Sequence, residues 1–164
     1  MLRRHLALLP LIALAAPALA QAPGGREVLR VTGRLAEPYR AGGARFDLAA
    51  LEALGRRELR TRTAWTGPQP QRFAGVPLAR VMEAVGAEGP QLRGVALNDY
   101  AIRAPLAELL RDGAFLATRQ DDEPLRIRDR GPVWMIFPWS QRPELDVATI
   151  RERAIWQLRR LEVG

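Results

Sequence analysis

Three short clusters of polar and aromatic residues could bind a ligand or carry chemistry. Their members are Arg62, Thr63 and Trp65; Asn98, Asp99 and Tyr100; and Arg128, Arg130 and Trp134. An arginine fork bonds both oxygens of a carboxylate or phosphate at once, and a tryptophan ring can stack on a planar ligand. The Asn-Asp-Tyr turn adds hydrogen-bond donors and acceptors. These residue types predict a site for a small anionic ligand, although a tryptophan in a strand is also typical of a core.

Two groups of carboxylates offer further chemistry. Asp99 with Asp129 has the composition of an acid–base pair, and Asp121-Asp122-Glu123 has the oxygen ligands that a hard cation such as calcium prefers. No spacing brings the first two residues together, and the acidic run is more typical of an exposed turn. The sequence therefore predicts neither a catalytic residue nor a metal ligand.

The missing residue types exclude most other reactions. The chain has no Cys, and its single His is His5. This excludes a thiol nucleophile, a Ser-His triad, a Cys/His zinc site and a His-ligated haem from the domain. All basic residues are Arg, so Schiff-base chemistry through Lys is excluded as well.

The N-terminus predicts export. Arg3 and Arg4 precede an apolar run over 6–19, and Ala18-Leu19-Ala20 is typical of a cleavage site before Gln21. The alternative, a membrane anchor, needs a longer apolar stretch of roughly 20 residues. We expect a signal peptide over 1–20, a flexible leader over 21–27 and one domain over 28–164, in the periplasm or secreted, with no membrane anchor after cleavage.

The net charge of +7 at pH 7 is compatible with an anionic ligand, an acidic protein or a membrane surface as partner. Arginine richness spread along a chain is also a common bias of composition. No basic run is interleaved with aromatic residues, so we expect no nucleic acid. The predicted partners are a small anionic ligand or a periplasmic or membrane protein.

The first half of the domain alternates short strands and helices. We predict strands over 28–33 and 58–65, and a helix over 48–54 capped by Asp47. Pro77 suits a first helical position, and Leu78, Val81, Met82 and Val85 form the apolar stripe that would follow it.

In the second half we predict strands over 92–97, 100–103, 114–118, 133–137 and 154–163. A short helix over 105–110 and a helix capped by Asp146 complete the set. Trp156 is expected in the core, whereas Trp139, in a loop flanked by prolines, is expected to be exposed as a partner contact. Short strands with a few irregularly placed helices predict an α+β fold of mixed sheets.

Four segments, taken in order, resemble the sulfite-oxidase-type molybdopterin-binding oxidoreductase domain. They are Phe73–Leu78, Ala96–Tyr100, Asp122–Leu125 with Arg130–Pro138, and Ile155–Val163. The resemblance spans about 28–163. It implies that family's α+β fold and a pocket for a molybdopterin cofactor, with the loop over 64–72 at its rim.

Two departures from the family pattern concern the cofactor. The family's molybdenum-binding Cys corresponds to a segment, 61–65, that contains no sulfur, and its His-Gly pair is Arg130-Gly131 here. Our leading hypothesis is an exported, non-catalytic domain that binds a small anionic ligand or a partner protein. A working molybdopterin enzyme, with molybdenum held through Thr63 or solvent oxygen, and a purely structural interaction domain are the alternatives.

Overall fold

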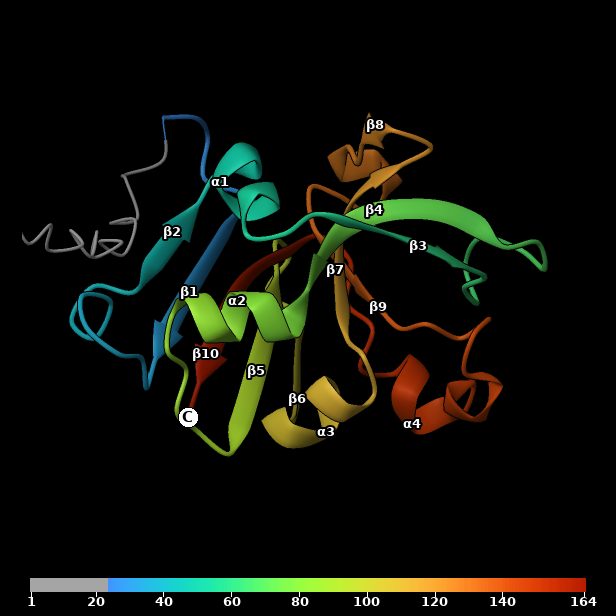
Figure 1. The fold of residues 1–164 in the computed structure, drawn as a ribbon. Helices are drawn as coiled ribbons and strands as arrows, with labels where there is room; N and C mark the ends of the chain where they lie inside the picture. Colours follow the sequence, from blue (N-terminus) through green and yellow to red (C-terminus); the bar gives the residue numbers. More distant parts are fainter. Residues whose placement is uncertain (1–23) are drawn as a thin grey trace, which may run out of the picture.

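The structure is a computed structural model that describes residues 24–164. The proposed signal peptide and the first residues of the leader lie outside this range. Two sheets and four short helices are present within it (Figure 1). Across these residues, no helix combines the length and apolar character needed to cross a membrane.

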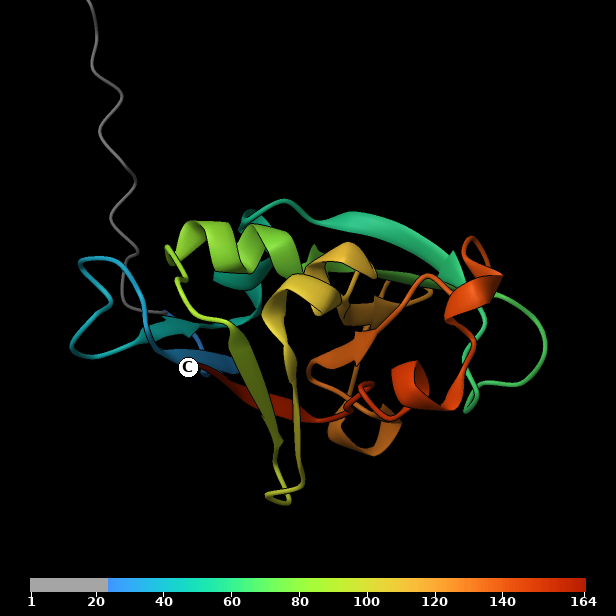
Figure 2. The same ribbon diagram turned by 90° about the horizontal axis from the view of Figure 1, so that it is seen from below.

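Sheet A has the strand order β2-β1-β10-β5-β6. Its strands are β1 (Leu29–Gly33), β2 (Ala44–Phe46), β5 (Gln91–Ala96), β6 (Ala101–Pro105) and β10 (Leu158–Val163). The first and last of these pair in parallel, with Val31 opposite Leu161, and the other pairs are antiparallel. Figure 2 shows the β5–β6 hairpin projecting from the body of the protein.

Sheet B is antiparallel and has the order β3-β4-β7-β8, with β9 also paired to β7. Its strands are β3 (Arg57–Thr61), β4 (Gln71–Pro77), β7 (Phe115–Gln120), β8 (Glu123–Pro124) and β9 (Trp134–Ile136). β9 is buried at all three positions, as its unbroken apolar sequence predicts.

Short helices connect the strands. They are α1 (Leu48–Ala53), α2 (Leu78–Ala84), α3 (Leu106–Arg111) and α4 (Ala148–Arg151), with 3-10 turns η1 (Ile127–Asp129) and η2 (Pro143–Leu145). The α2 helix covers one face of sheet A in both views (Figures 1 and 2). One hydrophobic core runs through both sheets, from Val31 and Leu161 to Leu116 and Ile136.

Local patterns placed most elements correctly. Asp47 caps α1 by accepting a hydrogen bond from the Ala50 amide at 2.8 Å. Leu78, Val81 and Met82 are the buried face of α2, but Pro77 is the last residue of β4 and the cap of α2, not a helical residue. The strands β2, β4 and β8 were not predicted from the sequence.

Three predictions about the ends of elements were wrong. The last strand was predicted from residue 154, but β10 begins at Leu158, and before it only Ile155 forms a single bridge, with Met135. β3 ends at Thr61, because the chain turns where the Thr63 hydroxyl accepts a hydrogen bond from the Trp65 amide. Asp146 does not cap α4; Val147 holds that position without a side-chain bond. The Asp146 carboxylate is instead hydrogen bonded by Arg62 and Arg151.

Candidate functional site

The loop after β3 is held by threonine hydroxyls. Thr61 is fully buried; its Oγ1 donates to the carbonyl of Arg62 at 3.1 Å and accepts from the amide of Ser140 at 3.0 Å. Thr63 is also buried, and its Oγ1 lies 2.9 Å from Oγ1 of Thr66 and accepts from the Trp65 amide at 3.2 Å. Both hydroxyls are thus committed to shaping the loop.

Trp65 lies at the centre of a tryptophan cluster. Its ring contacts those of Trp134, Trp139 and Trp156 edge-on, with centroids 6.0, 6.2 and 5.6 Å apart. Edge-to-face contacts at such distances are favourable beyond the area they bury. Trp134 is fully buried, as is typical of a tryptophan in a strand. Trp156 was expected in the core, but its side chain is 39% exposed, so that prediction was wrong.

Trp139 was predicted to be exposed, and the structure corrects this. Its side chain is 2% exposed, and its Nε1 donates to the carbonyl of Leu145 at 3.2 Å. The surrounding loop folds back over sheet B, where Gln141 bonds the carbonyl of Arg60 and Ser140 bonds Thr61. The Pro-flanked loop therefore packs against sheet B, and the Trp139 side chain is not exposed to a partner in this structure.

Arg130 fastens the tryptophan cluster to the segment before β9. Its Nη2 donates to the Trp65 carbonyl at 3.0 Å, and its guanidinium carbon lies 5.2 Å from the centroid of the Trp134 ring. Arg130 has a positive φ of 72°, which few non-glycine residues adopt. The next residue, Gly131, has no room for a side chain, because a Cβ there would lie 2.1 Å from the carbonyl oxygen of Leu125.

A cavity of about 430 Å³ opens beside the cluster, and we call it the tryptophan cavity. Its wall is formed by residues from the β5–β6 turn, the Trp65 loop and the segment after α4: Trp65, Ala96, Asn98, Tyr100, Arg151, Glu152, Ala154, Ile155 and Trp156. Tyr100 is 55% exposed, so it stands at the open side together with Trp156. Volumes in this range are typical of small-molecule sites.

A smaller cavity of about 290 Å³ lies next to it and shares one wall residue, Arg151. Arg62 and Thr63 line this smaller cavity. Asp146 accepts a hydrogen bond from Arg62 Nη2 at 3.0 Å and from Arg151 Nε at 2.8 Å, so one carboxylate holds both guanidinium groups in place.

The structure divides the predicted site residues among several places. Trp65, Asn98 and Tyr100 meet in the tryptophan cavity, and Arg62 and Thr63 line the neighbouring cavity. Asp99 points elsewhere: it is largely exposed and pairs with Arg159. Arg128 lines a third hollow, the arginine groove, which includes Arg26, Arg30, Arg126, Arg159 and Arg160.

Sequence reasoning missed six wall residues of the tryptophan cavity, among them the polar or aromatic Arg151, Glu152 and Trp156. The pair Arg151-Glu152 reads as ordinary helical surface, and no local signal marks it. Trp156 directly precedes a strand, and alternation alone assigns it to the core. The acidic run Asp121-Asp122-Glu123 is an exposed turn, and no group of acidic residues within 24–164 has the arrangement of a metal site.

Comparison with known proteins identifies the class. The profile of the oxidoreductase molybdopterin binding domain matches residues 48–141, and the chain belongs to this family. The fold is similar to that in the crystal structure of the sulfane dehydrogenase SoxCD from Paracoccus pantotrophus, with a TM-score of 0.59 and 17% identity. The match covers 82% of this chain and 37% of that one, so the chain spans well under half of that neighbour's length. No curated protein matched the chain.

Membership of this family raises the question of whether the residues fit its cofactor. The chain has no sulfur ligand other than thioethers, and residues 24–164 contain no imidazole. The hydroxyls of Thr61 and Thr63 are already hydrogen bonded, and Arg130 is engaged with Trp65 and Trp134. These side chains do not fit a molybdenum centre ligated by the protein.

Proposed function

We propose that the chain is an exported, non-catalytic member of its family that binds a small anionic ligand in the tryptophan cavity. The family fold is retained, while the side chains that would bind and tune a metal are replaced by threonine, tryptophan and arginine. Export is part of the proposal and rests on the pattern of residues 1–20; fractionation of cells that express the full chain tests it.

The observation that carries the ligand proposal is the position of Arg151 in the cavity wall. Its Nε and Nη2 bond Asp146, while within residues 24–164 its Nη1 has no hydrogen-bond partner. A guanidinium fixed on one side and open on the other is pre-organised to bind an anion. The rings of Trp65 and Trp156 and the amide of Asn98 would contact the rest of a small ring-bearing ligand.

Isothermal titration calorimetry with simple probes tests this site. We expect benzoate and phenyl phosphate to bind more tightly than benzyl alcohol, which has the ring without the charge. Arg151→Gln should remove this preference, and Trp156→Ala should weaken all three probes. Arg80→Gln, a surface change on α2 away from the cavity, is the matched control and should leave binding unchanged.

The competing hypothesis is a molybdopterin enzyme whose metal has no protein thiolate ligand. Elemental and pterin analysis of protein purified from its own host separates the two. Stoichiometric molybdenum with bound pterin would overturn the non-catalytic proposal. Equal binding of charged and neutral rings, or binding that survives Arg151→Gln, would overturn the anion site. The third hypothesis, a purely structural interaction domain, stays a prediction, but Trp139 is buried and so is not the exposed partner contact predicted from the sequence.

A further inference from the structure

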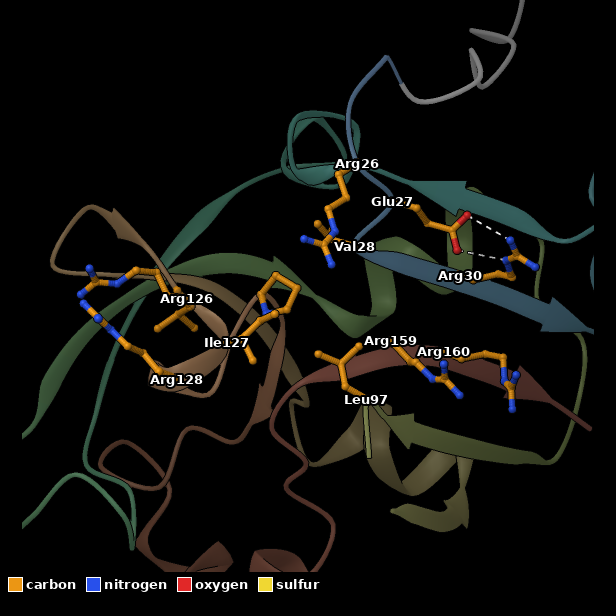
Figure 3. Close-up of a pocket in the computed structure, with 12 residues that line it drawn as sticks. Arg26, Glu27, Val28, Arg30, Leu97, Arg126, Ile127, Arg128, Arg159 and Arg160 are labelled. Carbon is orange, nitrogen blue, oxygen red and sulfur yellow. Dashed lines mark hydrogen bonds and ion pairs between the residues drawn. The ribbon is translucent and has the colours of Figure 1, made fainter. Parts of the chain in front are cut away.

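The arginine groove is a second large hollow of the described structure, separate from the tryptophan cavity. It encloses about 780 Å³ between β1, the start of β10, the end of β5 and the η1 turn (Figure 3). It shares no wall residue with either of the cavities around Arg151. Of its wall residues only Arg128 was predicted from the sequence as a ligand contact, and the proposed function does not use the groove.

Positive charge predominates along the groove. Six arginines line it, and the carboxylates paired with them are Glu27, Asp99, Asp129 and Glu162. Arg26 forms no ion pair with any residue from 24 to 164. The hydrogen bond from Arg93, together with the charges of Arg160 and Arg93, keeps the pKa of Glu162 below its usual value, so this carboxylate stays ionised. Even so, the six arginines outnumber the four carboxylates. The groove therefore has room for anionic groups from outside the chain.

An irregularity in β10 brings two consecutive arginines to this hollow. Side chains of neighbouring residues in a regular strand point to opposite faces. Leu158 pairs with Ala96 and Arg160 with Val95, so Arg159 is an extra residue in a β-bulge. Bulges redirect side chains, and here both Arg159 and Arg160 line the groove (Figure 3).

The middle of the groove is apolar. Leu97 and Ile127 line it and are 38% and 48% exposed. The described residues have six exposed large hydrophobic side chains, and four of them line either this groove or the tryptophan cavity, so the apolar exposure is concentrated at the hollows. Figure 3 shows Ile127 and Leu97 between Arg126 and Arg128 on one side and Arg159 and Arg160 on the other.

The turn that presents Ile127 is held in place. Arg126 bonds the carboxylate of Asp129 at 2.8 Å, the Gly131 amide donates to the Arg126 carbonyl at 2.8 Å, and Gln157 donates to the Ile127 carbonyl at 2.9 Å. These bonds hold the backbone of the turn, so the exposed side chain of Ile127 is presented from a fixed position. A pre-formed apolar surface loses little entropy when a ligand covers it.

We propose that the arginine groove binds an amphipathic organic anion, with a phosphate or carboxylate head and an apolar chain. The head bonds the guanidinium groups, and the chain covers Leu97 and Ile127. Each methylene of the ligand's apolar chain that is buried adds to the affinity, and so does each charge-assisted hydrogen bond to its anionic head. The apolar chain and the head of the ligand must therefore both raise the affinity. The same chemistry occurs in a free fatty acid or alkyl phosphate and in the headgroup region of an anionic lipid.

The test compares three probes by isothermal titration calorimetry on the purified protein. They are dodecyl phosphate below its micelle concentration, inorganic phosphate as head alone, and dodecyl maltoside as chain with a neutral head. We expect dodecyl phosphate to bind at least tenfold more tightly than either of the others. Equal affinity of inorganic phosphate, or of the neutral detergent, would overturn the proposal.

Variants locate the binding. The double variant Arg126→Gln with Arg128→Gln should weaken dodecyl phosphate at least tenfold, and Ile127→Ser should weaken dodecyl phosphate but not inorganic phosphate. The pair Arg80→Gln with Arg103→Gln removes the same charge outside the groove and should have no effect. If that pair weakens binding equally, the interaction is bulk charge attraction and the proposal fails.

Sedimentation with vesicles identifies the source of the anion. If the protein sediments with phosphatidylglycerol vesicles and is released when dodecyl phosphate is added, the natural ligand of the groove is a lipid headgroup. Binding of dodecyl phosphate without vesicle binding would assign it to a free amphiphile. Vesicle binding that survives the Arg126→Gln and Arg128→Gln changes, with no binding of dodecyl phosphate, would overturn the groove as the site.

Discussion

Arg130 donates a hydrogen bond from Nη2 to the carbonyl oxygen of Trp65 across 3.0 Å, joining two segments far apart in the sequence. The same guanidinium packs against the ring of Trp134. Where the family pattern has a histidine that helps to hold the cofactor, this chain has a side chain that holds its own loop closed. The side chain of Arg130 therefore makes contacts within the chain, to Trp65 and Trp134.

Arg130→Asn should loosen the Trp65 loop. Asn tolerates the left-handed backbone at this position, so the change isolates the loss of the hydrogen bond and of the ring contact. We expect a loss of about 1–2 kcal/mol in the free energy of unfolding, measured by urea denaturation, with altered tryptophan fluorescence of the native state. Arg128→Asn, at an exposed neighbour, is the control; equal loss from both changes would contradict the role of Arg130.

Trp139→Ala and Trp156→Ala should differ sharply in stability. Trp139 is buried, and its removal leaves a large cavity, for which we expect a cost of about 3–5 kcal/mol. Trp156 is 39% exposed and should cost well under half as much in the same urea titration. Similar losses for the two variants would show that their burial in solution is not as described.

Glu52 should make stability depend on pH in the acid range. Burial raises its pKa, but hydrogen bonds from Arg119 and Thr118 and the charge of Arg119 outweigh this, and the pKa lies below the usual 4.5. The ionised form is therefore favoured by folding, and its contribution is present above pH 4.5 and lost as the pH falls through the lowered pKa.

We expect Glu52→Gln to destabilise the protein by about 1–3 kcal/mol at pH 7. The difference from the wild type should shrink as the pH falls below 4.5. Unfolding curves at pH 7 and at several values below 4.5 check the sign. A gap between variant and wild type that stays constant, or grows, on acidification would rule out this linkage.

Gly75→Ala should be poorly tolerated, in contrast to Gly94→Ala. A Cβ at Gly75 would lie 2.0 Å from the carbonyl oxygen of Leu116 on the paired strand, at the irregular register of β4 and β7. At Gly94 the nearest atoms are side-chain carbons at 3.4 Å. We expect a loss of about 1–3 kcal/mol, or more, for Gly75→Ala and a near-neutral effect for Gly94→Ala. Thermal denaturation of both variants decides, and equal midpoints would be inconsistent with the close strand contact.

The fold was predictable wherever a local signal determined it. The Asp47 cap acts within one helical turn, the stripe from Leu78 to Met82 has a helical period, and the short apolar run before Pro138 is typical of a buried strand. The order of these segments also sufficed for the family resemblance, which the profile match over residues 48–141 confirms. Each of these signals lies within a few residues of what it predicts.

The site was less predictable because its features depend on packing between distant segments. Trp139 is buried only because the following loop bonds Arg60 and Thr61, about eighty residues earlier in the chain. Asp146 has the sequence context of a cap, yet two arginines from different segments compete successfully for its carboxylate. The bulge at Arg159 leaves no mark in the sequence, so the gathering of arginines at the groove could not be foreseen.

The parallel pairing of β1 with β10 carries a kinetic consequence. β10 lies in the middle of sheet A, between β1 and β5, so the sheet is split until residues 158–163 are inserted. Contacts that join segments so distant in sequence slow folding, because a long loop must close before they form. A nascent chain stalled on the ribosome before Leu158 could assemble only separate halves of this sheet, and its last strand acts as the closing step of the whole domain.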